Sequence, residues 1–510
     1  MTTLQVPLII RGKVIEDYEV EFGGRPGNPG GNMRFMTPDV KKYMRELVND
    51  KPISQLDLYS ITLNDIIDYL EELGQRLDLD KNPHWREGFE VSCLASNLSR
   101  SVLEGVYRAC PVVFSPTYVR DFIDARFGAE YLEGWVPRTL SDGRTIQVRA
   151  MGARGVHIIA GNVPVVATAT LMRSIVTRSD SIIKLPSNDL MTMVALARTM
   201  IDMAPDHPLT KHLSVGYWKG GDESVESEIY QPQHIEKIVA WGGFASVKHI
   251  TKYLQPGLDL ITLDPKNSTT LIGKEAMIDD KTMREVATRC AADMGGWDQE
   301  ACVNARVMFI ETGTDAKGIA AANKFGEYMY AALQNLPKSV SAGPIRFDAA
   351  LKSDINDILP LKDFYRVYCD PKNIEKTGAV IVSQMAEQVD FPQLLYGRVG
   401  NLVPMDNIED AVEFFTAMTQ TVGIYPDSLR VKLRDRAALT GGQMFVPVGY
   451  AISGTICSPV DGVEAERRMC RWIVDTHCDP AVTPGPWMHP EEIARVMANS
   501  KPKEKILEAA

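Results

Sequence analysis

The spacing of apolar residues divides the chain into a helical section and a longer section in which strands and helices alternate. From Thr37 to about Trp135, apolar residues recur three and four positions apart. One such series consists of Leu63, Ile66, Ile67, Leu70 and Leu73. This spacing is typical of amphipathic helices. From Gly155 onward, short apolar runs alternate with longer amphipathic stretches, which predicts βαβ units and a parallel sheet.

The alternating section contains two sets of candidate strands. The first set comprises the apolar runs 157–160, 181–185, 214–217, 237–241 and 269–272. Strands of this kind joined by helices are typical of a doubly wound nucleotide-binding layer. The second set comprises strands at 306–311, 379–383 and 401–404, and a helix at 407–421. We therefore expect an α/β protein with two lobes.

The first residues of the chain are expected to form a small hairpin. Residues 4–22 contain two β segments around Arg11-Gly12-Lys13. The glycine-rich residues 23–32 then connect this hairpin to the helical section.

Two other segments predict a β arm. Residues 138–150 form a hairpin pattern that turns at Ser141-Asp142-Gly143. The apolar residues 449–459 predict a second part of the arm, and a helix is expected over 462–476. Because an arm exposes strand edges unless another subunit covers them, we expect a homodimer or a dimer-based homotetramer.

Composition and charge exclude several classes of function. The 510 residues include 55 Lys and Arg against 66 Asp and Glu, a net charge of −11, with no concentrated basic stretch. We therefore expect no nucleic-acid partner. The longest nearly charge-free stretch, 155–172, is shorter than the roughly 20 apolar residues of a membrane span. The N-terminus shows no secretory pattern, so a cytoplasmic location is expected.

The cysteines do not predict a disulfide framework or a metal site. All 8 are dispersed, without a Cys-x-x-Cys pair. His477, Cys478 and His489 lack the ligand spacing of a zinc finger. No metal is therefore expected, and one cysteine remains a candidate for chemistry.

Two strand ends are candidates for binding a nucleotide, although no Gly-x-Gly-x-x-Gly motif follows any strand. Gly242 and Gly243 follow the strand 237–241 and precede a helix, where backbone N–H groups suit a pyrophosphate. A turn chosen only for tight packing is the alternative for such a glycine pair.

The second candidate is Lys184 with Ser187 and Asn188, at the end of the strand 181–185. Ligands bind at the carboxyl ends of strands in α/β sheets. Lys184 can bond a ribose, although a solvated strand end is the favoured explanation for such a residue taken alone. Asn188 lies where a nucleotide-binding carboxylate is expected, which leaves room for a 2′-phosphate.

Cys302 is the candidate nucleophile. It follows Gly295-Gly296 in a polar turn before a buried strand. Backbone amides that flank a cysteine in such a turn lower the pKa of its thiol. The alternative is a small buried apolar residue, the usual role of a cytosolic cysteine.

Four segments together resemble the aldehyde dehydrogenase superfamily. Residues 161–164 resemble its Pro-Trp-Asn-Phe-Pro segment, with Asn162 at the position whose amide helps form the oxyanion hole. Residues 184–188 resemble its Lys-Pro-Ser-Glu segment with one residue inserted, and 241–246 its Phe-Thr-Gly-Ser turn. Residues 299–302 resemble its Gly-Gln-x-Cys motif, again with one residue inserted.

Departures from that pattern indicate a particular branch of the superfamily. Aldehyde-oxidising members have Glu-Leu-Gly-Gly-Lys where this chain has Thr-Leu-Asp-Pro-Lys at 262–266. Thr262 therefore replaces the carboxylate that activates water. With its helical N-terminal section, the chain resembles the acyl-CoA reductase family typified by the fatty acid reductase of bacterial bioluminescence.

This resemblance implies an aldehyde dehydrogenase-like fold with four segments. Residues 1–136 are the N-terminal hairpin and helical section. Residues 137–266 are a Rossmann-type nicotinamide cofactor-binding domain, of which 137–150 form the arm. Residues 267–445 are the α/β catalytic domain, and 446–510 are the C-terminal arm and helix.

The resemblance also implies an activity, the reduction of an acyl-CoA or acyl-carrier thioester to an aldehyde. The thioester acylates Cys302, the Asn162 amide and the Cys302 N–H bind the oxyanion, and NADPH supplies hydride. NADPH is expected rather than NADH, because Asn188 does not repel a 2′-phosphate. Without an activated water, the acyl-enzyme survives until it is reduced.

Three alternatives remain. The first is an aldehyde dehydrogenase that works oxidatively or acylates CoA, which would need a water-activating carboxylate such as Glu300 for hydrolysis. The second is a cysteine acyltransferase or thioesterase without a nicotinamide cofactor. The third is a nonenzymatic acyl-carrier interaction module.

Overall fold

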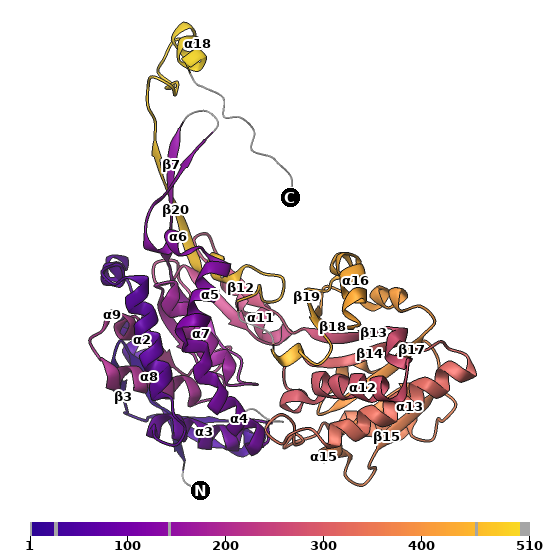
Figure 1. Ribbon diagram of the computed structural model, residues 1–510. Coiled ribbons are helices and arrows are strands. Elements are labelled where there is room, and N and C mark those ends of the chain that lie inside the picture. The colour runs from indigo at the N-terminus through magenta and orange to yellow at the C-terminus, as the bar shows by residue number, and fades with distance from the viewer. Residues whose placement is uncertain (1–2, 25–28, 141–143, 454–456, 500–510) are drawn as a thin grey trace.

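Figure 1 shows the computed structural model of the protein, which describes residues 3–24, 29–140, 144–453 and 457–499. Two α/β lobes lie side by side, and a narrow arm projects from the lobe formed by the N-terminal half of the chain. The two expected lobes and the arm are therefore present, and each lobe is built on one sheet.

The first lobe contains a seven-stranded sheet in the order β12-β11-β8-β9-β10-β2-β3. Its strands are β2 (Leu8–Ile10), β3 (Lys13–Ile15), β8 (Arg154–Ile158), β9 (Asp180–Lys184), β10 (Leu213–Gly216), β11 (Lys237–Trp241) and β12 (Asp259–Leu263). β8 to β12 are parallel, and β2 and β3 add an antiparallel edge. The connecting helices are α7 (Val165–Val176), α8 (Thr192–Met203), α9 (Pro208–Lys211), α10 (Glu223–Ile229) and α11 (Phe244–Ile250). The expected doubly wound layer is confirmed.

The N-terminal section is helical, as its apolar spacing predicts. Its helices are α1 (Met44–Leu47), α2 (Leu63–Arg76), α3 (Pro83–Ala95), α4 (Arg100–Ala109), α5 (Pro116–Arg126) and α6 (Ala129–Glu133). α2 begins at a capping box, in which Thr62 and Asp65 each accept a hydrogen bond from the other's backbone N–H. Ile66, Leu70 and Leu73 of α2 are fully buried, so the predicted stripe faces the core.

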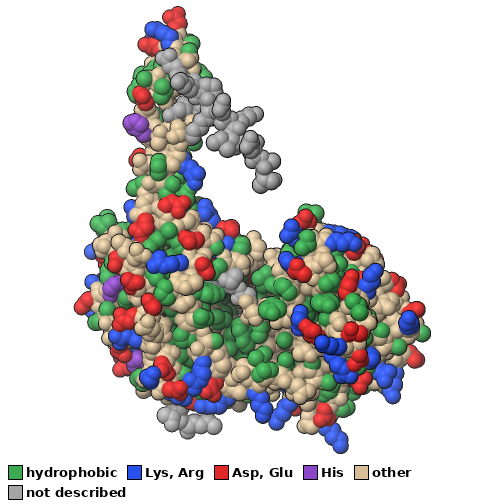
Figure 2. All heavy atoms as spheres, in the orientation of Figure 1, with side chains coloured by type: hydrophobic (Ala, Val, Ile, Leu, Met, Phe, Trp, Pro, Cys, Tyr) green, Lys and Arg blue, Asp and Glu red, His purple; other side chains and the backbone are tan. Residues whose placement is uncertain are grey.

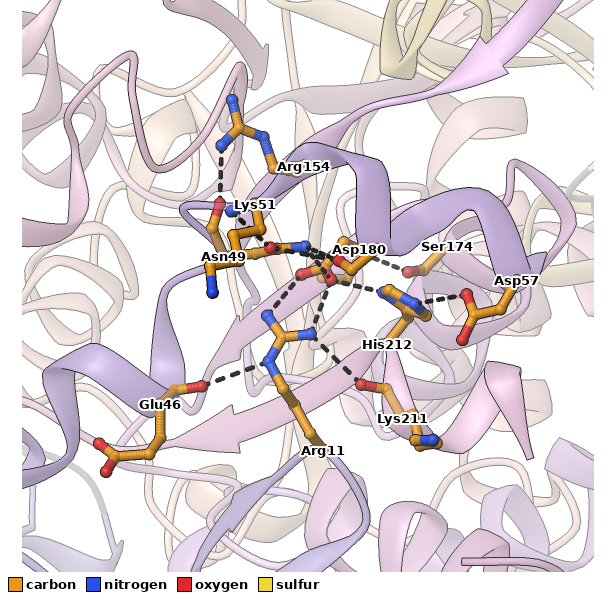
Figure 3. A network of polar contacts seen from close by, with 12 residues as sticks. Arg11, Glu46, Asn49, Lys51, Asp57, Arg154, Ser174, Asp180, Lys211 and His212 are labelled. Atoms are coloured by element: carbon orange, nitrogen blue, oxygen red, sulfur yellow. Dashed lines mark hydrogen bonds and ion pairs between the residues drawn. The ribbon is translucent and has the colours of Figure 1, made fainter. Parts of the chain in front are cut away.

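A buried polar network joins the N-terminal hairpin to the first sheet (Figure 3). The Asp180 carboxylate, at the start of β9, accepts hydrogen bonds from the Arg11 guanidinium at 2.7 and 3.0 Å and from Asn49 Nδ2 at 2.9 Å. Asp180 Oδ2 lies 2.5 Å from His212 Nδ1, and His212 Nε2 lies 2.9 Å from Asp57 Oδ1. Because Arg11 lies in the turn between β2 and β3, the network fixes this hairpin against the sheet.

The second lobe contains a seven-stranded sheet in the order β15-β16-β17-β14-β13-β18-β19. Its strands are β13 (Asn267–Ile272), β14 (Ala305–Glu311), β15 (Tyr365–Cys369), β16 (Ala379–Ser383), β17 (Val399–Met405), β18 (Thr419–Tyr425) and β19 (Met444–Pro447). Only β15 is antiparallel to its neighbour. Its helices are α12 (Asp280–Gly295), α13 (Ala316–Gln334), α14 (Ala349–Ile358), α15 (Ile374–Thr377) and α16 (Asp427–Thr440).

Two three-stranded sheets complete the fold. β1 (Leu4–Gln5), β4 (Val20–Gly23) and β5 (Arg34–Thr37) form a small sheet near the N-terminus. The arm consists of β6 (Val136–Thr139), β7 (Thr145–Gly152) and β20 (Cys470–His477), with α18 (Pro490–Asn499) near its tip. The turn expected at 141–143 lies outside the described residues. Within the described chain, no helix is long and apolar enough to cross a membrane.

One strand was expected in the wrong sheet. The run 269–272 forms β13, which lies between β14 and β18 in the second sheet and not in the nucleotide-binding layer. The remaining parallel strand of the first sheet is β12, which ends just before β13 begins. An apolar run marks a strand but not the sheet that it joins, so the pattern could not make this assignment.

The prediction of a helix over 407–421 is also wrong. This segment begins with a 3₁₀ turn, Ile408–Phe414, and then enters β18 at Thr419. The β-branched residues Thr419, Thr421 and Val422 favour a strand, and pairing with β13 on one side and β19 on the other determines the outcome.

The C-terminal part of the arm lies later in the chain than expected. Within 449–459, the described residues form a 3₁₀ turn, Ala451–Ser453, and no strand, while 454–456 lie outside the description. The helix expected over 462–476 is limited to α17 (Ala465–Met469), and β20 follows at once. β20 pairs antiparallel with the whole of β7, and this long-range pairing overrides the local helical pattern.

Candidate active site

Cys302 lies on a strained loop between α12 and β14. Trp297, Asp298 and Gln299 have φ angles of 49°, 51° and 66°, values that residues other than glycine rarely adopt. Such backbone persists only where the surroundings enforce it, and it is found most often at functional sites.

Buried side chains of this loop enforce its conformation. The Asp298 carboxylate accepts hydrogen bonds from the N–H groups of Ala342 at 2.7 Å and Gly343 at 2.8 Å. The Gln299 amide donates to the Val399 carbonyl at 2.8 Å and accepts from the Val399 N–H at 2.8 Å. Both side chains are buried, so the loop presents Cys302 in a fixed position.

The Cys302 thiol is half-buried, and the pKa of this thiol is raised above its ordinary value. Burial is the largest cause, and the charge of Asp461 adds to it. Hydrogen bonds from Gln420 and from the N–H groups of Cys302 and Val303 lower the pKa. The flanking amides therefore act as the sequence predicts, but burial outweighs them and the sulfur is a thiol at neutral pH.

The structure brings Asn162 to the Cys302 loop. Asn162 precedes α7, and its Nδ2 donates a hydrogen bond to the Glu300 carbonyl at 2.9 Å. A side-chain amide has two N–H donors, and the second has no acceptor among the described residues. That donor is available to a substrate oxygen.

Asn162 and Cys302 line one cavity of about 210 Å³. Most of its wall is apolar, and its apolar side chains include Val163, Val166, Trp241, Trp297, Met444 and Ile452. Since these residues come from both lobes, the cavity lies between them. Figure 2 shows apolar side chains gathered in the hollow between the two lobes. A wall of this kind suits a hydrocarbon chain.

Lys184 ends β9 and is buried. Its Nζ lies 5.7 Å from the ring centroids of Tyr217 and Trp218. The pKa of Lys184 is lowered to about 8, because the effect of burial outweighs the opposing effect of the Glu226 charge. No hydrogen-bond or ion-pair partner of Nζ occurs among the described residues, so this ammonium group suits a hydroxyl or phosphate ligand.

Gly242 and Gly243 lie at the same sheet edge as Lys184, because β11 and β9 both flank β8 in parallel. A Cβ added to Gly243 would meet no atom within 4 Å, so a ligand can approach this backbone closely. Ser187 and Asn188 are half-buried in the turn after β9. The residues at this edge fit a dinucleotide at the carboxyl ends of parallel strands.

Asn188 also contacts the segment that contains Asn162. A Cβ on Gly161 would lie 2.4 Å from Asn188 Oδ1, so any other residue at position 161 would require the Asn188 side chain to move. The candidate cofactor turn and the candidate oxyanion segment therefore pack directly against each other.

Neither suspected water-activating position faces the cavity. Thr262 lies in β12 and is not among the cavity residues. The Glu300 carboxylate is turned toward Asn97 Nδ2, at 2.6 Å, and toward the Tyr396 hydroxyl. Burial raises the pKa of Glu300 to about 8, so this group is mostly protonated at neutral pH.

Sequence reasoning missed the polar residues that the C-terminal part of the chain brings to the cavity. These are Gln420, Gln443 and Asp461. They lie far from Cys302 in the sequence, and none belongs to a recognisable motif. In the part of the chain that the structure describes, no group of three or more His, Cys, Asp or Glu side chains could hold a metal ion.

The two lobes, the cysteine loop between them and the arm define an aldehyde dehydrogenase fold. Aldehyde dehydrogenase 21 of Physcomitrella patens matches with a TM-score of 0.72 at 10% identity, over 94% of this chain and 99% of that chain. NADP-dependent glyceraldehyde-3-phosphate dehydrogenase of Bacillus halodurans matches with a TM-score of 0.68 at 11% identity, over 93% and 99%.

Within this fold class, the chain belongs to the acyl-CoA reductase (LuxC) family, whose model matches residues 58–472. It is 27% identical over 481 residues to a long-chain acyl-protein thioester reductase of Photorhabdus laumondii, covering 92% of this chain and 93% of that protein. It is 24% identical over 492 residues to a long-chain acyl-protein thioester reductase of Vibrio harveyi, covering 92% of each. The family and fold that the motifs resemble are confirmed, and the protein is an oxidoreductase.

Proposed function

We propose that this enzyme reduces a long-chain acyl thioester to the aldehyde through an acyl-enzyme on Cys302. The observation that carries this proposal is the apolar cavity that both Cys302 and Asn162 line. Family membership supports reduction of an acyl group, and the named relatives act on long-chain acyl-protein thioesters. Either an acyl-CoA or an acyl-protein thioester is therefore a suitable donor.

The chemistry follows from the groups around the sulfur. Cys302 attacks the thioester carbonyl, and the donor thiol leaves. The free N–H of Asn162 and the N–H of Cys302 stabilise the oxyanion that forms on the carbonyl oxygen. Of the two positions suspected of activating water, Thr262 has no carboxylate and Glu300 is turned toward Asn97 and Tyr396, so the acyl-enzyme persists. A nicotinamide cofactor held at the sheet edge of Lys184 and Gly243 would supply the hydride that converts the acyl group to the aldehyde, with release of the Cys302 sulfur.

We further propose that the cofactor is NADPH and that Lys184, Ser187, Asn188, Gly242 and Gly243 bind it. The Lys184 ammonium has no hydrogen-bond or ion-pair partner among the described residues, and together with the open backbone at Gly243 it supports a dinucleotide at this sheet edge. The absence of a carboxylate at position 188 favours a 2′-phosphate.

Steady-state oxidation of NADPH with palmitoyl-CoA, together with detection of the aldehyde, tests the proposal. Cys302→Ala should abolish turnover while leaving NADPH binding nearly intact. Cys369→Ala is the matched control, because Cys369 is also half-buried but lies in β15 at the far edge of the second sheet. Substantial turnover by the Cys302→Ala enzyme would contradict the proposal.

A further inference from the structure

The cavity that contains Cys302 has two other ionisable side chains, Arg173 and Asp461. Arg173 is already paired, because its Nε lies 2.9 Å from Glu466 Oε1 and both side chains are buried. Among the described residues that line the cavity, Asp461 is the only carboxylate. It belongs to a different segment from Thr262, which occupies the position of the usual hydrolytic base.

Gln420 connects Asp461 to the reactive sulfur. Gln420 Nε2 donates a hydrogen bond to Asp461 Oδ1. The same amide stabilises the thiolate form of Cys302 and so lowers the pKa of that thiol. Gln420 Oε1 and Gln443 Oε1 are buried without a hydrogen-bond partner among the described residues. The polar end of the cavity therefore retains free acceptors for the thiol of the departing donor.

The backbone at Asp461 is unusual. Asp461 has a φ of 55° and the next residue, Gly462, has a φ of 67°. Asp461 is nevertheless buried, with only 9% of the residue exposed. A left-handed residue other than glycine costs free energy and is typical of functional sites.

Several charges act on Asp461. Burial raises the pKa of its carboxyl group and Asp264 adds to this effect, whereas Gln420, Lys266 and Arg173 lower the pKa; the net shift is upward. The pKa of the Cys302 thiol is raised as well. When the proton moves from the Cys302 thiol to the Asp461 carboxylate, the negative charge moves from the carboxylate to the sulfur. The number of buried charges does not change, so burial opposes the transfer only weakly.

We propose that Asp461 is the catalytic base and acid of the acyl-transfer step. When the Cys302 sulfur forms its bond to the carbonyl carbon, the thiol proton passes to the Asp461 carboxylate. When the carbon–sulfur bond of the donor breaks, Asp461 returns this proton to the departing sulfur. No electrons are exchanged in this step. The inference rests on the proposed acyl-enzyme. It names Asp461 as the group that carries the proton from the Cys302 thiol to the departing sulfur.

Two measurements on Asp461→Asn without cofactor test this assignment. Asparagine tolerates left-handed backbone, so the variant should fold, and thermal unfolding checks this. The first measurement is the pH dependence of Cys302 alkylation by iodoacetamide, followed on the Cys302 peptide by mass spectrometry. Removal of the negative charge should shift its midpoint to lower pH, so alkylation at neutral pH should become faster.

The second measurement is the rate of Cys302 acylation by palmitoyl-CoA, which should change in the opposite direction. Below neutral pH, acylation should be slower in Asp461→Asn by about 10²–10⁴-fold, the usual contribution of a general base. Asp461→Glu should restore part of the rate. Asp435→Asn is the control, because Asp435 has a 96% exposed side chain on α16, and neither measurement should change.

An unchanged alkylation midpoint would show that Asp461 does not act on the Cys302 sulfur, and an unchanged acylation rate would show that it does not move the proton. Either result overturns the inference. A wild-type enzyme in which Cys302 is never acylated would instead contradict the proposed function, so the two failures are distinguishable.

Discussion

At the scale of single residues, the charge of one side chain should decide which cofactor is used. Asn188 follows β9 and packs against Gly161, beside the segment that contains Asn162. A glutamate at this position would repel a 2′-phosphate and could accept hydrogen bonds from a ribose. We predict a higher kcat/KM with NADPH than with NADH, and a shift toward NADH in Asn188→Glu. A wild-type preference for NADH would contradict this assignment.

A second residue-scale prediction concerns water. With an aldehyde and NADP⁺ alone, we expect one burst of NADPH close to the enzyme concentration, because Thr262 cannot activate water to release the acyl group. Slow turnover should follow, and free CoA should accelerate it by capturing the acyl group. Thr262→Glu should leave the rate without CoA unchanged, because position 262 does not line the cavity that contains Cys302.

Rapid steady release of free acid by the wild type would contradict this prediction. It would show that another carboxylate activates water. Glu300 was the first candidate from the sequence, but its side chain is held by Asn97 and Tyr396. Asp461, which lines the cavity, would then be the residue to test.

At the scale of secondary-structure elements, the Asp180 network should determine the stability of the first lobe. Asp180→Asn leaves Arg11 and His212 without a buried counter-charge, and breaking a buried ion pair costs about 3–5 kcal/mol. Asp202→Asn is the control, because Asp202 pairs with His84 at the surface with a side chain 62% exposed, where a pair contributes about 0–1 kcal/mol. Urea unfolding measures both, and equal changes would contradict the prediction.

The same network should make stability depend on pH. Burial lowers the pKa of His212, but the hydrogen bond to Asp180 and the nearby carboxylates raise it above the ordinary 6.5 overall. A raised pKa means that the stabilisation is complete below pH 6.5 and is lost as the pH rises through the folded value. His212→Gln should flatten the decline in unfolding free energy above pH 6.5. An unchanged slope would contradict this.

The elements also show what the sequence could and could not predict. Local signals identified the helical section, the strands β9 and β11, and the cysteine turn, because apolar spacing and glycine placement are visible along the chain. Pairing with distant strands decided the rest: it determined which sheet β13 joins, and it made strands of β18 and of β20 in the arm. In the site, Cys302 and Asn162 follow from motifs, whereas Asp461 reaches the cavity only through the folding of the C-terminal segment.

At the scale of the whole molecule, we propose that the arm joins two subunits. In the arm sheet β20-β7-β6, both outer strands have an unpaired edge within the described chain. Val474 in β20 and Trp487, which follows that strand in the chain, are 55% and 76% exposed, so both side chains are available to a second subunit. Light scattering should show a homodimer or homotetramer, and truncation after Met469 should yield monomers. A monomeric full-length protein would contradict the proposal.

The account depends most on a covalent acyl group at Cys302, which a single-turnover experiment measures directly. The enzyme is mixed with palmitoyl-CoA in the absence of cofactor, freed of excess substrate and examined by peptide mass spectrometry, and NADPH is then added. The account predicts one palmitoyl group on the Cys302 peptide, and its release as one equivalent of aldehyde for each NADPH oxidised. Acylation of a different residue, or aldehyde formation with Cys302 unmodified throughout, would contradict it.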